Sequence, residues 1–388
     1  MFKQMKRQKQ FLFMAVVAAA MLVISCGPQA VKPTSEMDDP RHHTNMGIRF
    51  LNEGNIGEAQ NSFARAIQLN PKFSMANAGL GIVKAYQKDF KAAAGYIDRG
   101  WNLASTSEEK VFAYVAYIRL YTMSKDPSNW LNLAREKFDF AVQTDPRSAL
   151  PYYFMGLAYK AALEFDKAEG MFAKVLDLKG DYTAEANTQW ELIQKIKRAM
   201  PGTLTGKKIA IVEKITRADT AALFMEELKI DKLYERRTPK TFDTSFKDPD
   251  KAKEKPRGPA TASDIADSPL RSDIEGILRV GVRGLEVNPD GTFDPLGLVR
   301  RGPYAMMIED ILIRVTGDEK LATKFIGSTS TFPDLRSDLP YFNAVMVVTS
   351  RGIMKGNIAT GQFDPEGTVS GVDALLVIRE FKEQLNFR

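Results

Sequence analysis

The chain has 388 residues, of which 44% are hydrophobic and 26% are charged, which is enough for two or three globular domains with buried cores. Its formal net charge is +6, but four lysine and arginine residues lie within the first 25 positions, and without them the net charge falls to +2. So small an excess does not predict a nucleic-acid-binding protein.

Residues 1–25 have the pattern of an export signal, with a basic start and an apolar run that is shorter than the roughly 20 residues of a membrane span. The run ends in Val23-Ile24-Ser25-Cys26-Gly27, which resembles the lipobox of bacterial lipoproteins, although Val23 stands where a leucine is usual. The resemblance implies cleavage before Cys26 and lipid on its thiol. The alternative is a plain signal peptide, or an uncleaved anchor, with an incidental cysteine.

Residues 26–39 are expected to form a lipidated, flexible tether, because this stretch is polar and contains proline. Lipid at Cys26 implies a place in the cell envelope. In a Gram-negative cell we expect the outer membrane, facing the periplasm, because Gly27 is not the aspartate that retains many lipoproteins in the inner membrane. In a Gram-positive cell the protein would lie at the cell surface.

Within the region of residues 40–200, a 34-residue period runs from about residue 40 to about residue 182. Glycine recurs from Gly47 to Gly81 at this spacing, alanine from Ala59 to Ala93, and the spacing returns further on after an insertion of seven residues. The pattern resembles the tetratricopeptide repeat (TPR), which implies helix pairs stacked into a right-handed solenoid. We expect units near 40–73, 74–107, 112–148 and 149–182, followed by a capping helix over 184–200. A generic helical bundle is the alternative.

The TPR resemblance also implies a groove for a protein or peptide partner, lined by the fifth, ninth and twelfth residues of the units. The matching positions are Thr44, Ile48, Leu51, Ala78, Ile82, Ala85, Tyr153, Leu157 and Lys160. Because most of them are apolar, we expect a partner helix or an extended apolar segment. The alternative is that the groove holds the chain's own capping helix.

A different repeat occupies residues 201–388. Phe293-Asp294-Pro295 recurs 70 residues later as Phe363-Asp364-Pro365, and Asp264-Ile265 recurs as Asp334-Leu335. With Thr216-Arg217-Ala218-Asp219, the pattern resembles the S-layer homology (SLH) module, which implies an α-helical, trefoil-like domain. We expect copies near 207–234, 263–316 and 332–386, the first of them truncated, and a charged insertion at 235–262.

In the SLH family, the arginine and the acidic residue that open the second helix face a groove and hold anionic cell-wall polysaccharide or peptidoglycan. The resemblance carries these roles to Arg217, Asp219 and Arg301, whereas the third copy has Gly371 at this position. We expect the arginines to form charge-assisted hydrogen bonds with the glycan and Asp219 to orient Arg217. The alternative, favoured by the divergent third copy, is a purely structural module.

No catalytic or metal site is predicted. The two histidines, His42 and His43, are adjacent and do not share a helix face, and no other histidine can serve as the base of a Ser-His-Asp or Cys-His site. The loops at 288–291 and 364–367 lack the full ligand set of a calcium loop and are expected to be turns. We therefore expect neither a metal nor another cofactor.

These features predict a mostly α protein, with a TPR solenoid followed by an SLH-like domain. The predicted function is that of a membrane-anchored, non-enzymatic adaptor that joins a protein partner to cell-wall polysaccharide or peptidoglycan. The alternative is an outer-membrane assembly or secretion-complex lipoprotein in which the SLH part is only structural.

Overall fold

The computed structural model describes residues 30–237 and 261–385. The predicted signal peptide, Cys26 and most of the charged insertion lie outside these ranges. The regular elements of the described residues are helices, and pairing between extended segments is limited to isolated bridges, so the predicted mostly α class is confirmed. Within the same ranges, no helix combines the length and the apolar character needed to cross a membrane. The chain divides into two compact units between Trp190 and Glu191.

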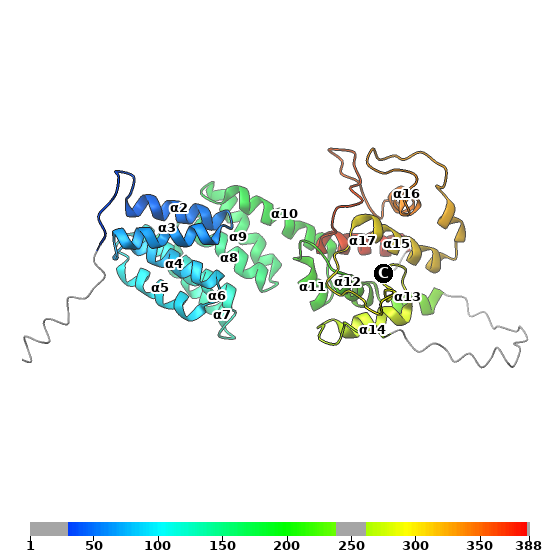
Figure 1. Cartoon of the computed structure of the whole chain (residues 1–388), viewed down its shortest axis with the longest axis horizontal. Helices are drawn as coiled ribbons and strands as arrows, with labels where there is room; N and C mark the ends of the chain where they lie inside the picture. Colours follow the sequence, from blue (N-terminus) through cyan, green and yellow to red (C-terminus); the bar gives the residue numbers. More distant parts are fainter. Residues whose placement is uncertain (1–29, 238–260, 386–388) are drawn as a thin grey trace, which may run out of the picture. The chain divides into compact units, whose positions relative to one another are not determined.

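Unit 1 is built from consecutive pairs of helices, each packed against its neighbours along the chain (Figure 1). The helices are α2 (Pro40–Asn52), α3 (Ile56–Leu69), α4 (Ser74–Tyr86), α5 (Phe90–Leu103), α6 (Ser107–Ser124), α7 (Trp130–Thr144), α8 (Leu150–Ala161), α9 (Phe165–Leu178) and the start of α10 (Thr183–Ala199). This arrangement is consistent with TPR repeats. The predicted insertion lies mainly in α6, which has 18 residues where α4 has 13.

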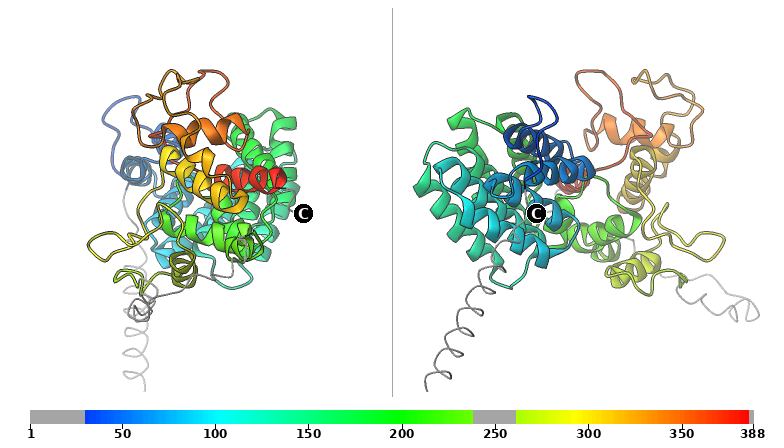
Figure 2. Two further views of the ribbon diagram at one scale, coloured as in Figure 1. Left: turned by 90° about the vertical axis from the view of Figure 1, so that its right-hand side faces the viewer. Right: turned by 60° about the vertical axis from the view of Figure 1, so that its left-hand side comes forward.

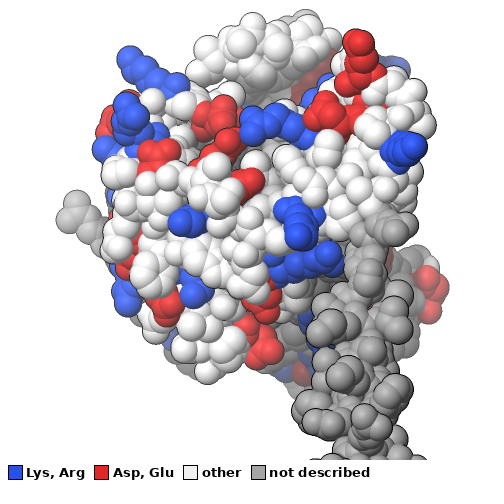
Figure 3. Space-filling view, turned by 90° about the vertical axis from the view of Figure 1, so that its left-hand side faces the viewer, with Lys and Arg blue, Asp and Glu red and all other residues white. Residues whose placement is uncertain are grey.

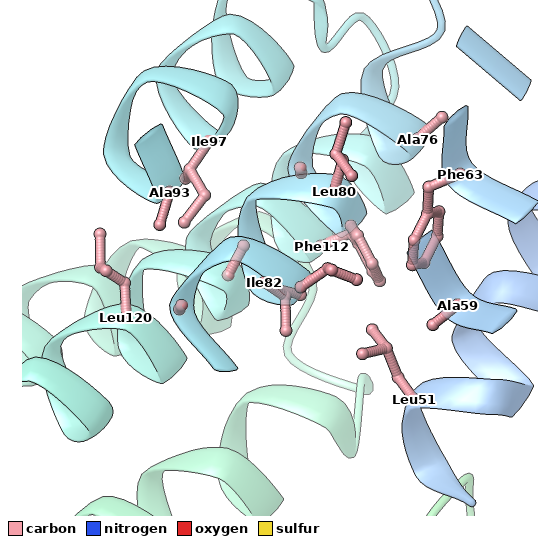
Figure 4. Packing of buried hydrophobic residues seen from close by; sticks show 14 of the residues in the cluster. Leu51, Ala59, Phe63, Ala76, Leu80, Ile82, Ala93, Ile97, Phe112 and Leu120 are labelled. Atoms are coloured by element: carbon pink, nitrogen blue, oxygen red, sulfur yellow. The ribbon is translucent and has the colours of Figure 1, made fainter. Parts of the chain in front are cut away.

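The glycines of the 34-residue period make room for large side chains on the second helix of each pair. A Cβ atom on Gly47 would lie 2.7 Å from the ring of Phe63, and one on Gly156 would lie 2.6 Å from the ring of Phe172. Both rings are completely buried. Figure 4 shows Phe63 within the apolar cluster formed by α2 to α6. The sequence period therefore follows from the packing of one helix on the next.

Acidic and basic side chains are mixed on the face of unit 1 that is drawn in Figure 3. Figure 3 shows the end of the molecule that lies at the left of Figure 1, where blue and red groups alternate and are separated by uncharged areas. No extended region of a single sign is visible on this face.

Unit 2 contains shorter helices joined by long loops (Figure 1). After the end of α10 come α11 (Leu204–Ala210), α12 (Arg217–Ala222), its π-helical continuation η1 (Leu223–Leu228), α13 (Ile230–Arg237), α14 (Arg271–Val280), α15 (Arg301–Thr316), the 3₁₀ turn η3 (Glu319–Thr323), α16 (Phe342–Ser350) and α17 (Gly371–Gln384). In the left-hand view of Figure 2, the yellow helix α15 and the red helix α17 can be followed by their colour.

A ring of three backbone hydrogen bonds relates α12, α15 and α17, the helices that open with the repeated motif, to one another. Ile215 donates to the carbonyl of Val369 at 2.9 Å, Val369 donates to Val299 at 3.0 Å, and Val299 donates back to Ile215 at 3.0 Å. Each residue is buried and lies two positions before the first residue of α12, α15 or α17, next to the residue that caps the helix. The ring gives unit 2 an approximate threefold arrangement, as a trefoil-like domain requires.

Candidate functional site

Two aspartates hold the repeated Phe-Asp-Pro loops of unit 2. The carboxylate of Asp264 accepts hydrogen bonds from the backbone N–H groups of Phe293 and Asp294, at 2.7 and 2.8 Å. Asp334 holds residues 363–364 in the same way, at 2.9 and 2.6 Å. A carboxylate that accepts two backbone bonds fixes a loop strongly, which explains why both aspartates recur with their loops.

The side chain of Arg217 crosses from α12 to the next module. Its Nε, Nη1 and Nη2 atoms donate to the backbone carbonyls of Phe293, Gly284 and Glu286, at 2.7, 2.6 and 2.9 Å. The guanidinium lies 4.7 Å from the centroid of the Phe293 ring. Burial lowers the pKa of Arg217, and carboxylates on the neighbouring module act in the opposite direction. Each nitrogen of this guanidinium is thus engaged in joining two modules.

Arg301, the equivalent residue on α15, makes a similar contact but keeps one nitrogen available. Its Nε and Nη2 atoms donate to the carbonyls of Phe363 and Lys355, both at 2.8 Å, and the guanidinium lies 4.6 Å from the Phe363 ring centroid. Its Nη1 atom has no hydrogen-bond partner among the described residues. Burial lowers the pKa of Arg301, and carboxylates including Asp373 oppose this effect.

Asp219 does not orient Arg217, and this expectation is corrected. Its carboxylate accepts from the backbone N–H and the hydroxyl of Thr216, at 2.9 and 2.8 Å, while its own N–H donates to that hydroxyl at 3.1 Å. The two residues form a capping box that satisfies free donors at the start of α12. The Thr-x-x-Asp spacing was visible in the sequence and could have identified this role.

The third interface has no arginine because there is no space for one. A Cβ atom on Gly371 would lie 1.7 Å from the carbonyl oxygen of Ile209, and the Gly371 N–H donates to Val212 at 2.8 Å. Val212, which follows α11, accepts this bond as Gly297 and Gly367 of the Phe-Asp-Pro loops accept from the N–H groups of Arg217 and Arg301 at the other two interfaces. Gly371 is therefore a consequence of this close backbone approach.

A cleft of about 870 Å³ lies beside Arg301. It is formed by the last turns of α10, by α17 and by the loop that follows α16. Its lining comprises Lys195, Arg198, Arg301, Ile353, Met354, Lys355, Gly356, Asn357, Ile358, Ala359, Asp373, Leu376, Val377, Arg379, Glu380 and Glu383. Five of these residues are basic and three are acidic, so the cleft favours an anionic ligand.

The predicted groove of unit 1 needs a correction. Six of its nine residues are buried in the packed helices, namely Thr44, Leu51, Ala78, Ile82, Ala85 and Tyr153. Since α4 packs against both α2 and α6, neighbouring helices cover the positions expected to face a partner. Of the others, Leu157 is partly exposed and Lys160 donates to Gln189 at 2.5 Å. Ile48 lines a separate pocket.

This pocket of unit 1 has a volume of about 570 Å³. Its lining comprises Asn45, Ile48, Arg49, Asn52, Met75, Glu108, Val111, Phe112, Asp145, Ser148, Leu150, Asp181, Tyr182 and Glu185. The Tyr182 hydroxyl donates to the side-chain carbonyl of Asn52 at 3.0 Å, which links the two ends of the repeat region. Four acidic residues face one arginine, so the pocket is acidic as well as partly apolar.

The two histidines lie at the beginning of α2. His43 Nε2 lies 2.8 Å from a carboxylate oxygen of Asp38, and Arg65 Nε donates to the same oxygen at 3.0 Å. Arg65 is the main reason that the pKa of Asp38 lies well below its usual range. In the described ranges, no group of three or more histidine, cysteine or acidic side chains is arranged to hold a metal ion.

Comparison with known protein families identifies one segment of the chain. Residues 331–374 match the family model of the S-layer homology domain. The segment contains Lys355, Phe363 and Asp373, which form or support one side of the cleft. The chain therefore carries an SLH domain near its C-terminal end, which indicates binding of cell-wall polysaccharide and a place in the cell envelope. No curated protein matches the chain.

Proposed function

We propose that this protein is a non-enzymatic component of the cell envelope that binds an anionic cell-wall polysaccharide in the cleft beside Arg301. The observation that carries the proposal is the free Nη1 atom of Arg301 at a cleft with an excess of basic residues. A guanidinium fixed by two carbonyls presents its remaining N–H groups in a defined direction. A carboxylate or phosphate group would accept them as charge-assisted bonds.

Arg217 has a different part in this proposal. Its three nitrogens already donate to backbone carbonyls of the second module, so a glycan would have to displace or share those bonds. Displacement costs roughly 1–3 kcal/mol for each buried acceptor left without a partner. We assign Arg217 to holding the modules together and Arg301 to the ligand.

Unit 1 supplies the second contact of the proposed adaptor. Its acidic, partly apolar pocket suits a protein segment with basic and apolar side chains. Lipid on Cys26 would hold the protein at a membrane while the SLH domain holds the wall. A scaffold role for unit 2 is the second candidate, and it is favoured by the bonds that Arg217 and Arg301 make between modules.

Co-sedimentation with purified sacculi tests the polysaccharide part of the proposal. The full chain should pellet with wall sacculi of its own bacterium at low salt, and binding should weaken as salt screens the charges. Full chain that stays in the supernatant at low salt would leave unit 2 as a scaffold.

A further inference from the structure

The end of α10 belongs to unit 2 and contributes to the cleft beside Arg301. Lys195 and Arg198 line the cleft, and both side chains are exposed. They are three positions apart, so they lie on the same side of the helix. This segment precedes the residues that match the SLH family, so that match alone does not point to it.

The position of these two cations is fixed by the packing of α10. Ile193 and Ile196 are buried on the other side of the same turns, and Ala199, which neighbours Lys195 along the helix surface, is buried as well. In addition, Nη1 of Arg379, on α17, donates to the backbone carbonyl of Arg198. Bonds to the last carbonyls of a helix tie down its C-terminal end. Lys195 and Arg198 are therefore presented from a well-anchored surface.

Three cations of the cleft have no side-chain partner within the described residues, namely Lys195, Arg198 and Lys355. Arg379, by contrast, pairs with Glu383 at 2.8 Å. Among the acids, Asp373 accepts a bond from the hydroxyl of Ser370 at 2.6 Å, which uses part of its capacity at the start of α17. The unpaired charge of the cleft is thus predominantly positive.

We propose that Lys195 and Arg198 form a second anion subsite of this cleft. In this proposal, which rests on the function proposed above, they hold a carboxylate or phosphate group adjacent to the one held by Arg301. The cleft then selects a polymer that carries repeated negative charges. A neutral polysaccharide would leave three exposed cations unpaired and would gain little.

The test compares two double variants of the full chain that remove the same charge. In Lys195→Gln/Arg198→Gln the change lies in the cleft, whereas in Lys208→Gln/Lys214→Gln it lies on exposed residues outside it. Binding to sacculi is measured over a series of salt concentrations, after thermal melts have shown that both variants fold. We expect the cleft variant to bind about three- to tenfold more weakly at low salt, with a shallower salt dependence, and the control to bind like wild type.

Two treated sacculus preparations identify the anion. Amidation caps the carboxylates in one, and hydrofluoric acid removes phosphodiester-linked polymer from the other. The difference between wild type and the cleft variant should disappear with the preparation that lacks the recognised group. Equal binding by the two double variants would overturn the subsite. If Arg301→Ala still weakens binding in that case, the proposed function stands without the second subsite. Wild-type protein that fails to bind sacculi would overturn both the subsite and the proposed function.

Discussion

The guanidinium of Arg217 is bonded through Nε to the carbonyl oxygen of Phe293, at 2.7 Å and across 76 positions of the chain. Arg301 repeats this bond with Phe363 at 2.8 Å. In both cases the arginine at the start of one module's second helix donates a hydrogen bond to the Phe-Asp-Pro loop of the next module. The two arginines differ in their remaining guanidinium nitrogens: both Nη atoms of Arg217 have a hydrogen-bond partner, whereas Nη1 of Arg301 has none among the described residues.

Replacement of Arg217 by alanine should destabilise unit 2. The change removes three charge-assisted bonds from a half-buried side chain, and we expect a loss of about 2–3 kcal/mol in the free energy of unfolding. Denaturant unfolding of the full chain, followed by a probe in unit 2, measures it. Arg271→Ala is the control, because Arg271 makes only an exposed pair with Glu275, worth at most about 1 kcal/mol. Equal losses of stability in the two variants would argue against the role of Arg217 in joining the two modules.

Replacement of Gly371 by alanine should disrupt unit 2 more severely. The new Cβ atom would meet the backbone oxygen of Ile209, which cannot move without shifting α11. We expect a large loss of stability, measured by thermal melts. Gly170→Ala on α9 is the matched control, because nothing lies within 4 Å of its added Cβ, and alanine there should stabilise the helix by about 0.5–1 kcal/mol. A Gly371→Ala chain that melts like wild type would contradict the close approach.

The contact between Asp38 and Arg65 should make the stability of unit 1 depend on pH. Because the pKa of Asp38 is lowered in the folded state, its contribution is complete above the unfolded pKa of about 4 and declines as pH falls below that value. Wild type should therefore exceed Asp38→Asn in stability at pH 6, and the difference should narrow between about pH 4 and pH 2. Melts of the two proteins over this range measure it, and a constant difference would exclude Asp38 as the titrating group.

If Cys26 carries the lipid anchor, its replacement should change the cleavage of the signal peptide and the attachment of the protein to the membrane. Cys26→Ala should leave an unprocessed or soluble form, because two or more acyl chains are what make such attachment stable. Fractionation of cells with labelled fatty acid distinguishes the products. A variant that is cleaved normally and still partitions into membranes would show that Cys26 is not the anchor.

The sequence was sufficient to predict the structure at positions where a residue type has a single packing role. The spacing of Gly47 and Gly81 predicted the helix pairs, because only glycine leaves room for Phe63 and Ile97. The recurrence of Asp264 as Asp334 marked the modules, because each aspartate holds a loop.

Other features depended on contacts that no local pattern shows. Ala78 and Ile82 were expected in an open groove, but both are buried, Ala78 against Gly100 of α5, and that depends on how tightly successive helices pack. Lys195 and Arg198 were interpreted only as part of a capping helix, because their contribution to the cleft depends on the bond from Arg379 across 181 positions.

The central claim is that the free face of Arg301 binds an anionic wall polymer, and the pair Arg301→Ala and Arg217→Ala tests it most directly. Both variants lose the bonds that join two modules, but only Arg301 lines the cleft. The measurement is the affinity of each full-length protein for sacculi at low salt, at a temperature where melts show that both are folded. We predict that Arg301→Ala binds about tenfold more weakly or worse, because a charge-assisted bond contributes roughly 1.5–3 kcal/mol, and that Arg217→Ala binds nearly as wild type. Equal affinity of Arg301→Ala and wild type, both folded, would contradict the account.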